Sequence, residues 1–251
     1  MLFAEWRSLQ ANKNHKNKDL IHIKDRWHTQ SRKCFYQYMA TSCNLPIIQD
    51  PQDICMLSDL IWDFRPDLII ETGVARGGSL VHHAQGLAAL NFIDLNKDIP
   101  FSRKVLGIDI EIRDETKEAL DRHPLKFMFE TIEGSSIDVK IAAKVKKIAS
   151  DYEKVMVVLD SNHEENHVLS ELEIYSRLVS FGMPLFVMDT GIEFAPKYSF
   201  SETRPWSVGS NPYTAVMKFL QKKSGKKFVL NDEYEKRYLL TSSPSGLLIK
   251  K

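Results

Sequence analysis

The sequence predicts an α/β fold: a doubly wound, mainly parallel sheet with an antiparallel hairpin at its C-terminal edge and an N-terminal helical extension. From about residue 51, short β-branched or apolar runs alternate with segments whose apolar residues have helical spacing, which is typical of βαβ units. The chain has 251 residues, of which 43% are hydrophobic and 27% charged. This length and composition suffice for the buried core of a globular protein.

The elements are predicted in order along the chain. Residues 1–50 are polar and weakly periodic, so we expect a frayed start, helices around 27–41, and a boundary between an extension, 1–50, and a domain, 51–251. Asp53 is expected to cap a helix that runs to Phe64. Strands are then expected at 68–71, 105–110, 126–132, 155–160 and 185–189. The helices between and after them are expected at 79–90, 115–122, 137–149 and 168–181.

Beyond the fifth strand the alternation stops. Residues 195–212 contain three prolines and are expected to form a long loop, a feature that is usually functional or disordered. A helix is expected at 212–221, followed by strands at 228–230, 238–241 and 247–249. The turn at 242–246 is expected to join the last two strands as the edge hairpin.

Charge and cysteine content narrow the class of protein. The chain has 34 Lys and Arg against 33 Asp and Glu, a net charge of +1, which gives no global electrostatic reason to expect nucleic acid. The N-terminus lacks the apolar segment of a secretory signal, and no apolar run approaches the length of a membrane span. Cys34, Cys43 and Cys55 form no Cys-x-x-Cys pair, so we expect free thiols and a cytoplasmic protein.

A glycine turn follows the first predicted strand, in the sequence Glu71-Thr-Gly73-Val-Ala-Arg-Gly77-Gly78-Ser79. The glycines allow a ligand to approach the backbone, and the N–H groups that begin the next helix can bind an anionic group. The spacing differs from the Gly-x-Gly-x-x-Gly of dinucleotide-binding proteins, so a carboxylate fits better than a pyrophosphate. The alternative is a tight turn without a ligand.

Further polar residues end the next two strands. Asp109 ends the second strand, where an acid can accept hydrogen bonds from both hydroxyls of a ribose. Together with the glycine turn it favours a nucleoside ligand over a merely solvated acid. Ser136 lies in a polar turn after the third strand, and the simpler interpretation of this serine is a helix N-cap.

Five motifs carry a resemblance to a known family: Glu71-Thr-Gly-x-x-x-Gly-Gly-Ser79, Gly107-Ile-Asp-Ile-Glu111, Gly134-Ser-Ser136, Leu159-Asp-Ser161 and Met188-Asp-Thr190. From about residue 35 the chain resembles the cephalosporin-hydroxylase-like group of class I S-adenosylmethionine-dependent methyltransferases and, more distantly, catechol O-methyltransferase. The resemblance implies a Rossmann-like methyltransferase fold. It implies that Glu71, Gly73 and Ser79 surround the methionine part of S-adenosylmethionine, that Asp109 holds the ribose, and that Ser136 lies near the adenine.

The same resemblance raises the question of a metal ion. In the family an Asp after the fourth strand and an acidic pair after the fifth hold Mg²⁺, and the matching acids here are Asp160 and Asp189. The first member of the pair is Met188, which cannot bind a hard cation. Two carboxylates can still hold Mg²⁺ with waters, so Mg²⁺ is an open expectation. Without a metal, Asp160 is a helix-capping acid and Asp189 a turn residue.

A histidine motif offers a competing interpretation. His163-Glu164-Glu165-Asn166-His167 matches the His-Glu-x-x-His of zinc peptidases, but it follows a parallel strand and no later histidine completes a site. We expect instead that Asp160 and His163 are catalytic, with the neutral imidazole taking the proton of an acceptor hydroxyl. The alternative for His163 is a structural role at the start of a helix.

These observations predict an S-adenosylmethionine-dependent O-methyltransferase that acts on a hydroxyl of a sugar or another small natural product. The competing hypotheses are a zinc metallohydrolase and a non-catalytic nucleoside-binding module, the latter motivated by Met188. The expected partner is a small-molecule or saccharide acceptor, with no nucleic acid and no membrane span. The loop 195–212, which contains Trp206, is expected to close over the acceptor; the alternative is a contact within a homo-oligomer.

Overall fold

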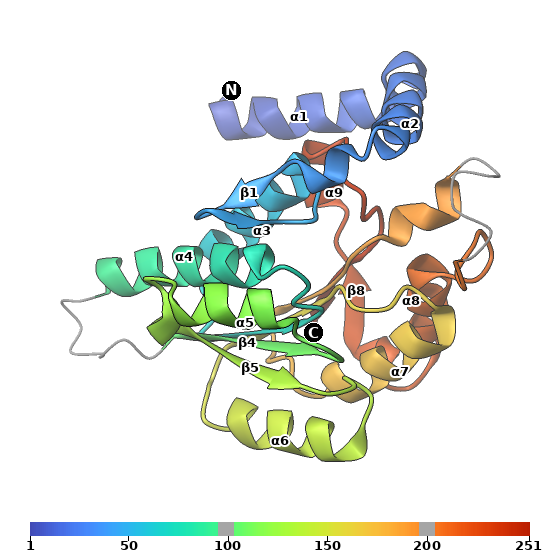
Figure 1. The fold of residues 1–251 in the computed structure, drawn as a ribbon. Helices are drawn as coiled ribbons and strands as arrows, with labels where there is room; N and C mark the ends of the chain where they lie inside the picture. The colour runs from blue at the N-terminus through green and yellow to red at the C-terminus, as the bar shows by residue number, and fades with distance from the viewer. Residues whose placement is uncertain (95–102, 196–203) are drawn as a thin grey trace.

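A central sheet organises the fold (Figure 1), which a computed structural model describes for residues 1–94, 103–195 and 204–251. Among these residues the sheet has seven strands in the order β5-β4-β3-β6-β7-β9-β8. Five of them are parallel: β3 (Leu68–Thr72), β4 (Lys104–Asp109), β5 (Phe129–Glu133), β6 (Val155–Leu159) and β7 (Pro184–Val187). The antiparallel strand β9 (Leu247–Lys250) lies between β7 and β8 (Phe228–Leu230). The doubly wound fold with an antiparallel C-terminal edge is therefore confirmed.

The strand order reverses beside β3. The chain adds β4 and β5 on one side of β3 and then β6 and β7 on the other. This reversal opens a crevice above the carboxyl ends of β3 and β6, where open α/β sheets bind their ligands. Every residue of β3 and β6 is buried, which explains why β6 is apolar throughout and β3 begins with three consecutive apolar residues instead of alternating.

Helices cover both faces of the sheet (Figure 1). One face carries α3 (Pro51–Phe64), α4 (Gly78–Ile93) and α5 (Asp114–Asp121), and the other carries α6 (Val139–Ala149), α7 (Glu165–Tyr175) and α8 (Pro212–Gln221). The bounds of α8 are those predicted, because the Asn211 side chain accepts hydrogen bonds from the N–H groups of Tyr213 and Thr214 and Pro212 occupies the first turn. No helix in the described ranges is long and apolar enough to span a membrane.

The N-terminal helical extension is confirmed, with different bounds from those expected. Helix α1 (Phe3–Lys16) begins almost at the N-terminus, α2 (Lys18–Lys33) ends well before residue 41, and a small ribbon of β1 (Thr41–Ser42) and β2 (Leu45–Pro46) follows a short 3₁₀ turn. Both terminal nitrogens of Arg32 donate to the carboxylate of the buried Asp50, each at 2.9 Å. This pair ties the extension to the start of α3. The boundary between residues 50 and 51 stays a prediction.

Two local predictions are wrong. Asp53 does not cap α3: the N-cap is Asp50, and Asp53 lies buried in the first turn, where it accepts hydrogen bonds from Thr241 and Ser242. The segment 238–241 is not a strand, because it follows the short helix α9 (Glu233–Arg237), and β9 instead pairs with β8. The edge pair therefore has a long connection instead of a tight turn.

Candidate active site

A cavity of about 180 Å³ lies at the carboxyl ends of β3 and β6, where the strand order reverses. Three segments form its walls: the glycine turn, the ends of β6 and β7, and the stretch that joins β2 to α3. The lining residues are Pro46, Ile48, Gln49, Gly73, Val74, Ala75, Arg76, Gly78, Ser79, Asp160, Ser161, His163 and Asp189. Of the predicted site residues, five line the cavity, whereas Glu71, Asp109 and Ser136 do not.

The glycine turn is pressed against the loop that follows β6. Gly73 has a φ of +95°, and a Cβ built on it would lie 2.0 Å from the carbonyl oxygen of Asp160, so no other residue fits there. Gly77 has a φ of +83° and serves as the N-cap of α4. Ala75 also adopts a left-handed conformation, with a φ of +47°, which costs a non-glycine residue about 1–2 kcal/mol. The tight approach of the turn to the loop after β6 therefore depends on glycine at position 73.

Asp109 holds this turn from the side of β4. Its Oδ2 accepts hydrogen bonds from the N–H groups of Val74 and Ala75 at 2.8 and 2.9 Å, and its Oδ1 accepts one from Glu111 at 3.2 Å. A carboxylate has about four lone-pair sites, so acceptor capacity remains for a ribose hydroxyl. The arrangement fits a nucleoside whose ribose lies beside the turn.

Glu71 lies behind the turn and not in the cavity wall. Its side chain is fully buried, and its Oε1 is 3.4 Å from Nε2 of the equally buried His83. Neither carboxylate oxygen has a hydrogen-bond partner among the described residues. A buried carboxylate without hydrogen bonds is costly, and the imidazole of His83 is the basic group beside it.

Ser136 belongs to a polar network under α7. Its Oγ lies 3.1 Å from Nε2 of His167, which also lies 3.5 Å from a carboxylate oxygen of Glu171. The hydrogen bond to Glu171 raises the pKa of His167. Ser136 is not the N-cap of the following helix, which is Asp138. The roles of Glu71 and Ser136 toward the cofactor stay predictions.

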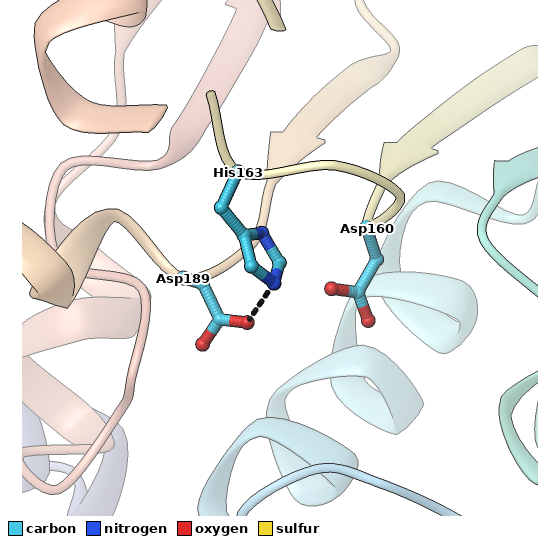
Figure 2. Close-up of side chains that lie close together, drawn as sticks. All are labelled: Asp160, His163 and Asp189. Carbon is cyan, nitrogen blue, oxygen red and sulfur yellow. Dashed lines mark ion pairs between the residues drawn. The ribbon is translucent and has the colours of Figure 1, made fainter. Parts of the chain in front are cut away.

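Three other side chains converge at the cavity: Asp160 after β6, His163 three residues later, and Asp189 after β7 (Figure 2). Each offers one atom, and these atoms all lie within 4.8 Å of one another. Nε2 of His163 is 3.3 Å from Oδ2 of Asp189. The pKa of Asp160 is raised well above its usual value, first by burial and then by the charge of Asp189. A donor set of two carboxylates and an imidazole fits a divalent cation.

Backbone strain positions one of these carboxylates. Asp189 has a φ of +56°, and its N–H donates to Oγ of Ser243 at 3.0 Å. Asp tolerates this left-handed conformation better than most residues. The preceding residue, Met188, is 2% exposed, and Oγ of Ser243 donates to its sulfur at 3.8 Å. Met188 therefore lies in the core and not in the cavity wall.

Sequence reasoning missed Gln49. Its Nε2 donates to Oδ2 of Asp160 at 3.2 Å, and this hydrogen bond opposes the rise in the pKa of the carboxyl. The residue stands in the N-terminal extension, 111 positions from its partner, and nothing in the local sequence marks it. Pro46 and Ile48 also line the cavity from this segment, and nothing in the local sequence marks them either. The extension therefore supplies part of the site.

The described part of the 195–212 loop reaches the same cluster. The ring of Trp206 meets the imidazole of His163 edge-on, with centroids 4.9 Å apart and planes at 86°. The guanidinium of Arg204 lies 4.9 Å from the centre of the Trp206 ring. Tyr198 and Phe200, two further aromatic residues of the loop sequence, lie outside the described residues. Trp206 thus packs against the histidine of the cluster.

The His-Glu-x-x-His motif does not form a zinc site in the described structure. Helix α7 begins at Glu165, so His163 precedes the helix, and His167 turns toward Ser136 and Glu171 instead. His163 joins Asp160 and Asp189, without His167. The resulting arrangement, a glycine turn and an acidic cluster at the switch point of a doubly wound sheet, defines a Rossmann-like S-adenosylmethionine-dependent methyltransferase.

Sequence comparison identifies the family. The chain belongs to the family described as Rhamnosyl O-methyltransferase/CmcI, which it matches over residues 34–251. It is 28% identical over 217 residues to the rhamnosyl O-methyltransferase of Mycobacterium tuberculosis H37Rv, covering 85% of this chain and 77% of the relative. The rhamnosyl O-methyltransferase of Mycobacterium leprae is 26% identical over 230 residues, covering 91% of both chains. The protein is an S-adenosylmethionine-dependent O-methyltransferase.

Comparison with solved structures supports the fold. An apo structure of CmcI has a TM-score of 0.52 at 18% identity, covering 85% of this chain and 76% of the other. A putative caffeoyl-CoA O-methyltransferase from Staphylococcus aureus has a TM-score of 0.58 at 14% identity, covering 89% of this chain and 99% of the other. At these identities the comparison concerns the fold alone.

Proposed function

We propose that the protein methylates a hydroxyl of a rhamnosyl or similar deoxyhexosyl group, with Asp160 and His163 at the acceptor oxygen. The observation that carries the proposal is the convergence of Asp160, His163 and Asp189 beside the glycine turn. The names of the relatives favour a rhamnosyl acceptor. Trp206 offers an aromatic face beside His163, which suits the apolar face of a deoxysugar.

The cofactor would bind along the glycine turn. Gly73 and Ser79 line the cavity and would surround the methionine part, and Glu71 would lie behind it. Asp109 would accept a hydrogen bond from the ribose while it keeps its bonds to the turn, and Ser136 would lie toward the adenine. When bound, S-adenosylmethionine supplies a methyl group on a positively charged sulfur.

The chain's own residues would orient the acceptor and receive its proton. Asp160 and His163 would hold the acceptor oxygen beside the glycine turn, so that it would face the methyl group of a cofactor held by that turn. In the absence of a cation, the hydroxyl proton passes to the neutral imidazole of His163, and Asp189 at 3.3 Å stabilises the imidazolium. Trp206 would exclude water from this transfer.

A divalent cation would bind between Asp160 and Asp189. Both carboxylates line the cavity, and the raised pKa of Asp160 reflects buried negative charge that a cation would offset. When bound, a cation such as Mg²⁺ would lower the pKa of the acceptor hydroxyl. We treat this metal as part of the proposal.

The test is methyl transfer from labelled S-adenosylmethionine to rhamnosides, compared with glucosides and with a catechol. Asp160→Asn is expected to lower kcat by about 100-fold or more, the size of general acid–base and electrostatic contributions. The dissociation constant of the cofactor should stay within about twofold, because Asp160 is not expected to touch the cofactor's methionine or ribose groups. His167→Ala is the matched control and should keep most of the activity. Transfer to none of the sugars, or full activity in Asp160→Asn, would contradict the proposal.

A further inference from the structure

The cluster at the cavity has an unusual donor set for a hard cation. Asp160 and Asp189 supply oxygen atoms, and His163 is the third residue whose ligand atom lies within 4.8 Å of theirs. Met188, which stands next to Asp189, is buried against Ser243 and has no oxygen to offer. The third candidate ligand beside the two carboxylates is therefore the imidazole of His163.

The orientation of His163 supports a role as ligand. Its Nε2 edge points between the two carboxylates, 3.3 Å from Oδ2 of Asp189 (Figure 2). Trp206 packs edge-on against the same ring at 4.9 Å, which restricts its rotation. A ligand fixed before the cation arrives loses less freedom on binding.

The charges of the residues around the cluster also favour binding of a cation. Asp160 and Asp189 are two acids whose ligand atoms lie within 4.8 Å of each other at the cavity wall. Arg76 is the one Lys or Arg among the residues that line the cavity in the described structure, and it is ion-paired with Glu115. Gln49 donates a single hydrogen bond to Asp160. The two carboxylates therefore have no cationic side chain of their own within the cavity wall described here.

We propose that His163 is the third protein ligand of the cation and that it makes the site selective for a transition metal of the Mn²⁺ to Zn²⁺ series over Mg²⁺. This inference rests on the metal site proposed above. Mg²⁺ binds mainly carboxylates and waters, whereas imidazole suits transition metals, whose affinity for nitrogen ligands is higher. With a cation bound, Nε2 of His163 would be occupied as a ligand, so the cation would lower the pKa of the acceptor hydroxyl and the proton would pass to water.

The experiment is a metal titration of the full chain without cofactor or acceptor. Free Mn²⁺ is followed by electron paramagnetic resonance, Mg²⁺ by competition, and Co²⁺ by its visible absorption. The unmodified protein should bind Mn²⁺ at least about tenfold more tightly than Mg²⁺. His163→Ala should weaken Mn²⁺ binding by about tenfold or more, since loss of even an outer-shell partner costs that much, and change Mg²⁺ binding little.

Two further variants complete the design. His163→Glu replaces the imidazole by a carboxylate and should narrow or reverse the preference for Mn²⁺, and the Co²⁺ spectrum should change with it. His167→Ala removes a histidine that lies outside the cluster and should bind every metal as the unmodified protein does. Circular dichroism should show the same fold for all variants, so a loss of binding is not a loss of structure.

The outcomes separate this inference from the proposed function. Equal Mn²⁺ affinity in the unmodified protein and in His163→Ala overturns the inference, as does Mg²⁺ binding at least as tightly as Mn²⁺. Absence of Mn²⁺ and Co²⁺ binding by the unmodified protein also overturns the inference, whereas methyl transfer to rhamnosides in a chelator would leave the proposed acceptor standing. Metal binding as expected, with no transfer to any sugar, supports the inference while the proposed acceptor fails.

Discussion

Asp109 holds the glycine turn and is proposed to bind the ribose of the cofactor, so its substitution tests both roles. Three backbone N–H groups donate to its carboxylate, two of them from the glycine turn. Asp109→Ala should weaken the binding of S-adenosylmethionine by about 1.5–3 kcal/mol, the range for a hydrogen bond to a charged group. Isothermal calorimetry measures the change. Asp109→Asn keeps one oxygen acceptor for the turn and should lose less affinity than Asp109→Ala. Equal affinity in all three proteins would mean that the ribose binds elsewhere.

Trp206 is the residue that distinguishes an acceptor lid from an oligomer contact. Because its ring meets His163 edge-on, Trp206→Ala should raise the KM of the acceptor or lower kcat by about fivefold or more, which corresponds to the roughly 1 kcal/mol that an aromatic pair contributes. Steady-state kinetics with varied acceptor tests this. Trp206→Phe keeps an aromatic face and should recover much of the loss. Cofactor affinity and assembly size should not change; if light scattering shows a dissociated oligomer with normal subunit kinetics, the lid hypothesis is wrong.

At the scale of elements, the glycine turn after β3 depends on a missing side chain. Gly73→Ala would place a Cβ 2.0 Å from the carbonyl oxygen of Asp160 and would also strain a backbone with a φ of +95°. We expect a loss of folding free energy beyond the 1–2 kcal/mol or so of backbone strain, together with a measurable loss of cofactor affinity. Gly182→Ala is the control, because Gly182 has a φ of +75° and no heavy atom within 4 Å of its built Cβ. Urea unfolding of both variants separates the steric cost from the backbone cost. Equal destabilisation would show that the turn can move away from β6.

The elements that could be predicted are those with local signals. Parallel strands β3, β4 and β6 are continuous buried runs, and α8 has its cap residues in sequence, so these were placed within one or two residues. The segment 238–241 has strand-forming residues, but the hydrogen bonds of the sheet edge go to β8 instead. Asp is a common helix N-cap residue, but the Asp53 side chain is buried and accepts hydrogen bonds from Thr241 and Ser242 instead of capping α3. Local propensity failed where a partner distant in sequence decided the structure.

The residues of the candidate site likewise divide into those that the sequence predicts and those that depend on tertiary packing. The five predicted residues that line the cavity follow the neighbouring strands β3, β6 and β7 or begin the helices after them, so topology alone brings them to one edge of the sheet. They are Gly73, Ser79, Asp160, His163 and Asp189. Gln49 comes from a segment outside the repeating units, and its contact with Asp160 depends on how that segment packs. The left-handed conformation of Asp189, which aims its carboxylate, likewise leaves no signal in the sequence. Motif order predicts which strand ends meet, and tertiary packing decides what covers them.

At the scale of the whole molecule, the N-terminal extension and the domain act on one site. Arg32 anchors Asp50 at the start of α3, and the adjacent Gln49 reaches Asp160. Helix α1 packs on α9 near the C-terminus, so the extension bridges the two ends of the chain (Figure 1). Arg32→Ala should therefore lower activity by loosening Gln49, although Arg32 does not line the cavity. Comparison with Gln49→Ala tests this: the double variant should lose little more than either single variant, whereas additive losses would mean that the two residues act independently.

The pH dependence of stability should contain two opposing contributions on the paired helices α3 and α4. Burial raises the pKa of Asp53 to about 6, although Thr241 and Ser242 donate to it, and burial lowers the pKa of His82 to about 4. The Asp53 contribution is present below its unfolded pKa and is lost as pH rises through about 6. The His82 contribution is present above its unfolded pKa and is lost as pH falls through about 4. Each amounts to roughly 3 kcal/mol at 1.36 kcal/mol for each pKa unit.

Between pH 4 and 6 these contributions offset each other, so the free energy of unfolding of the unmodified protein should change less with pH than either contribution alone requires. Asp53→Asn removes the contribution that decreases as pH rises, so the free energy of unfolding of this variant should rise more steeply with pH. His82→Gln removes the contribution that increases as pH rises, so the free energy of unfolding of this variant should fall with pH over the same interval. The slope is the quantity to compare, because a change in packing caused by a substitution shifts the whole profile, whereas the slope reports the titrating group. The hydrogen bonds from Thr241 and Ser242 are already included in the pKa of Asp53. Urea unfolding at several pH values gives the three slopes, and parallel profiles for the three proteins would contradict both shifts.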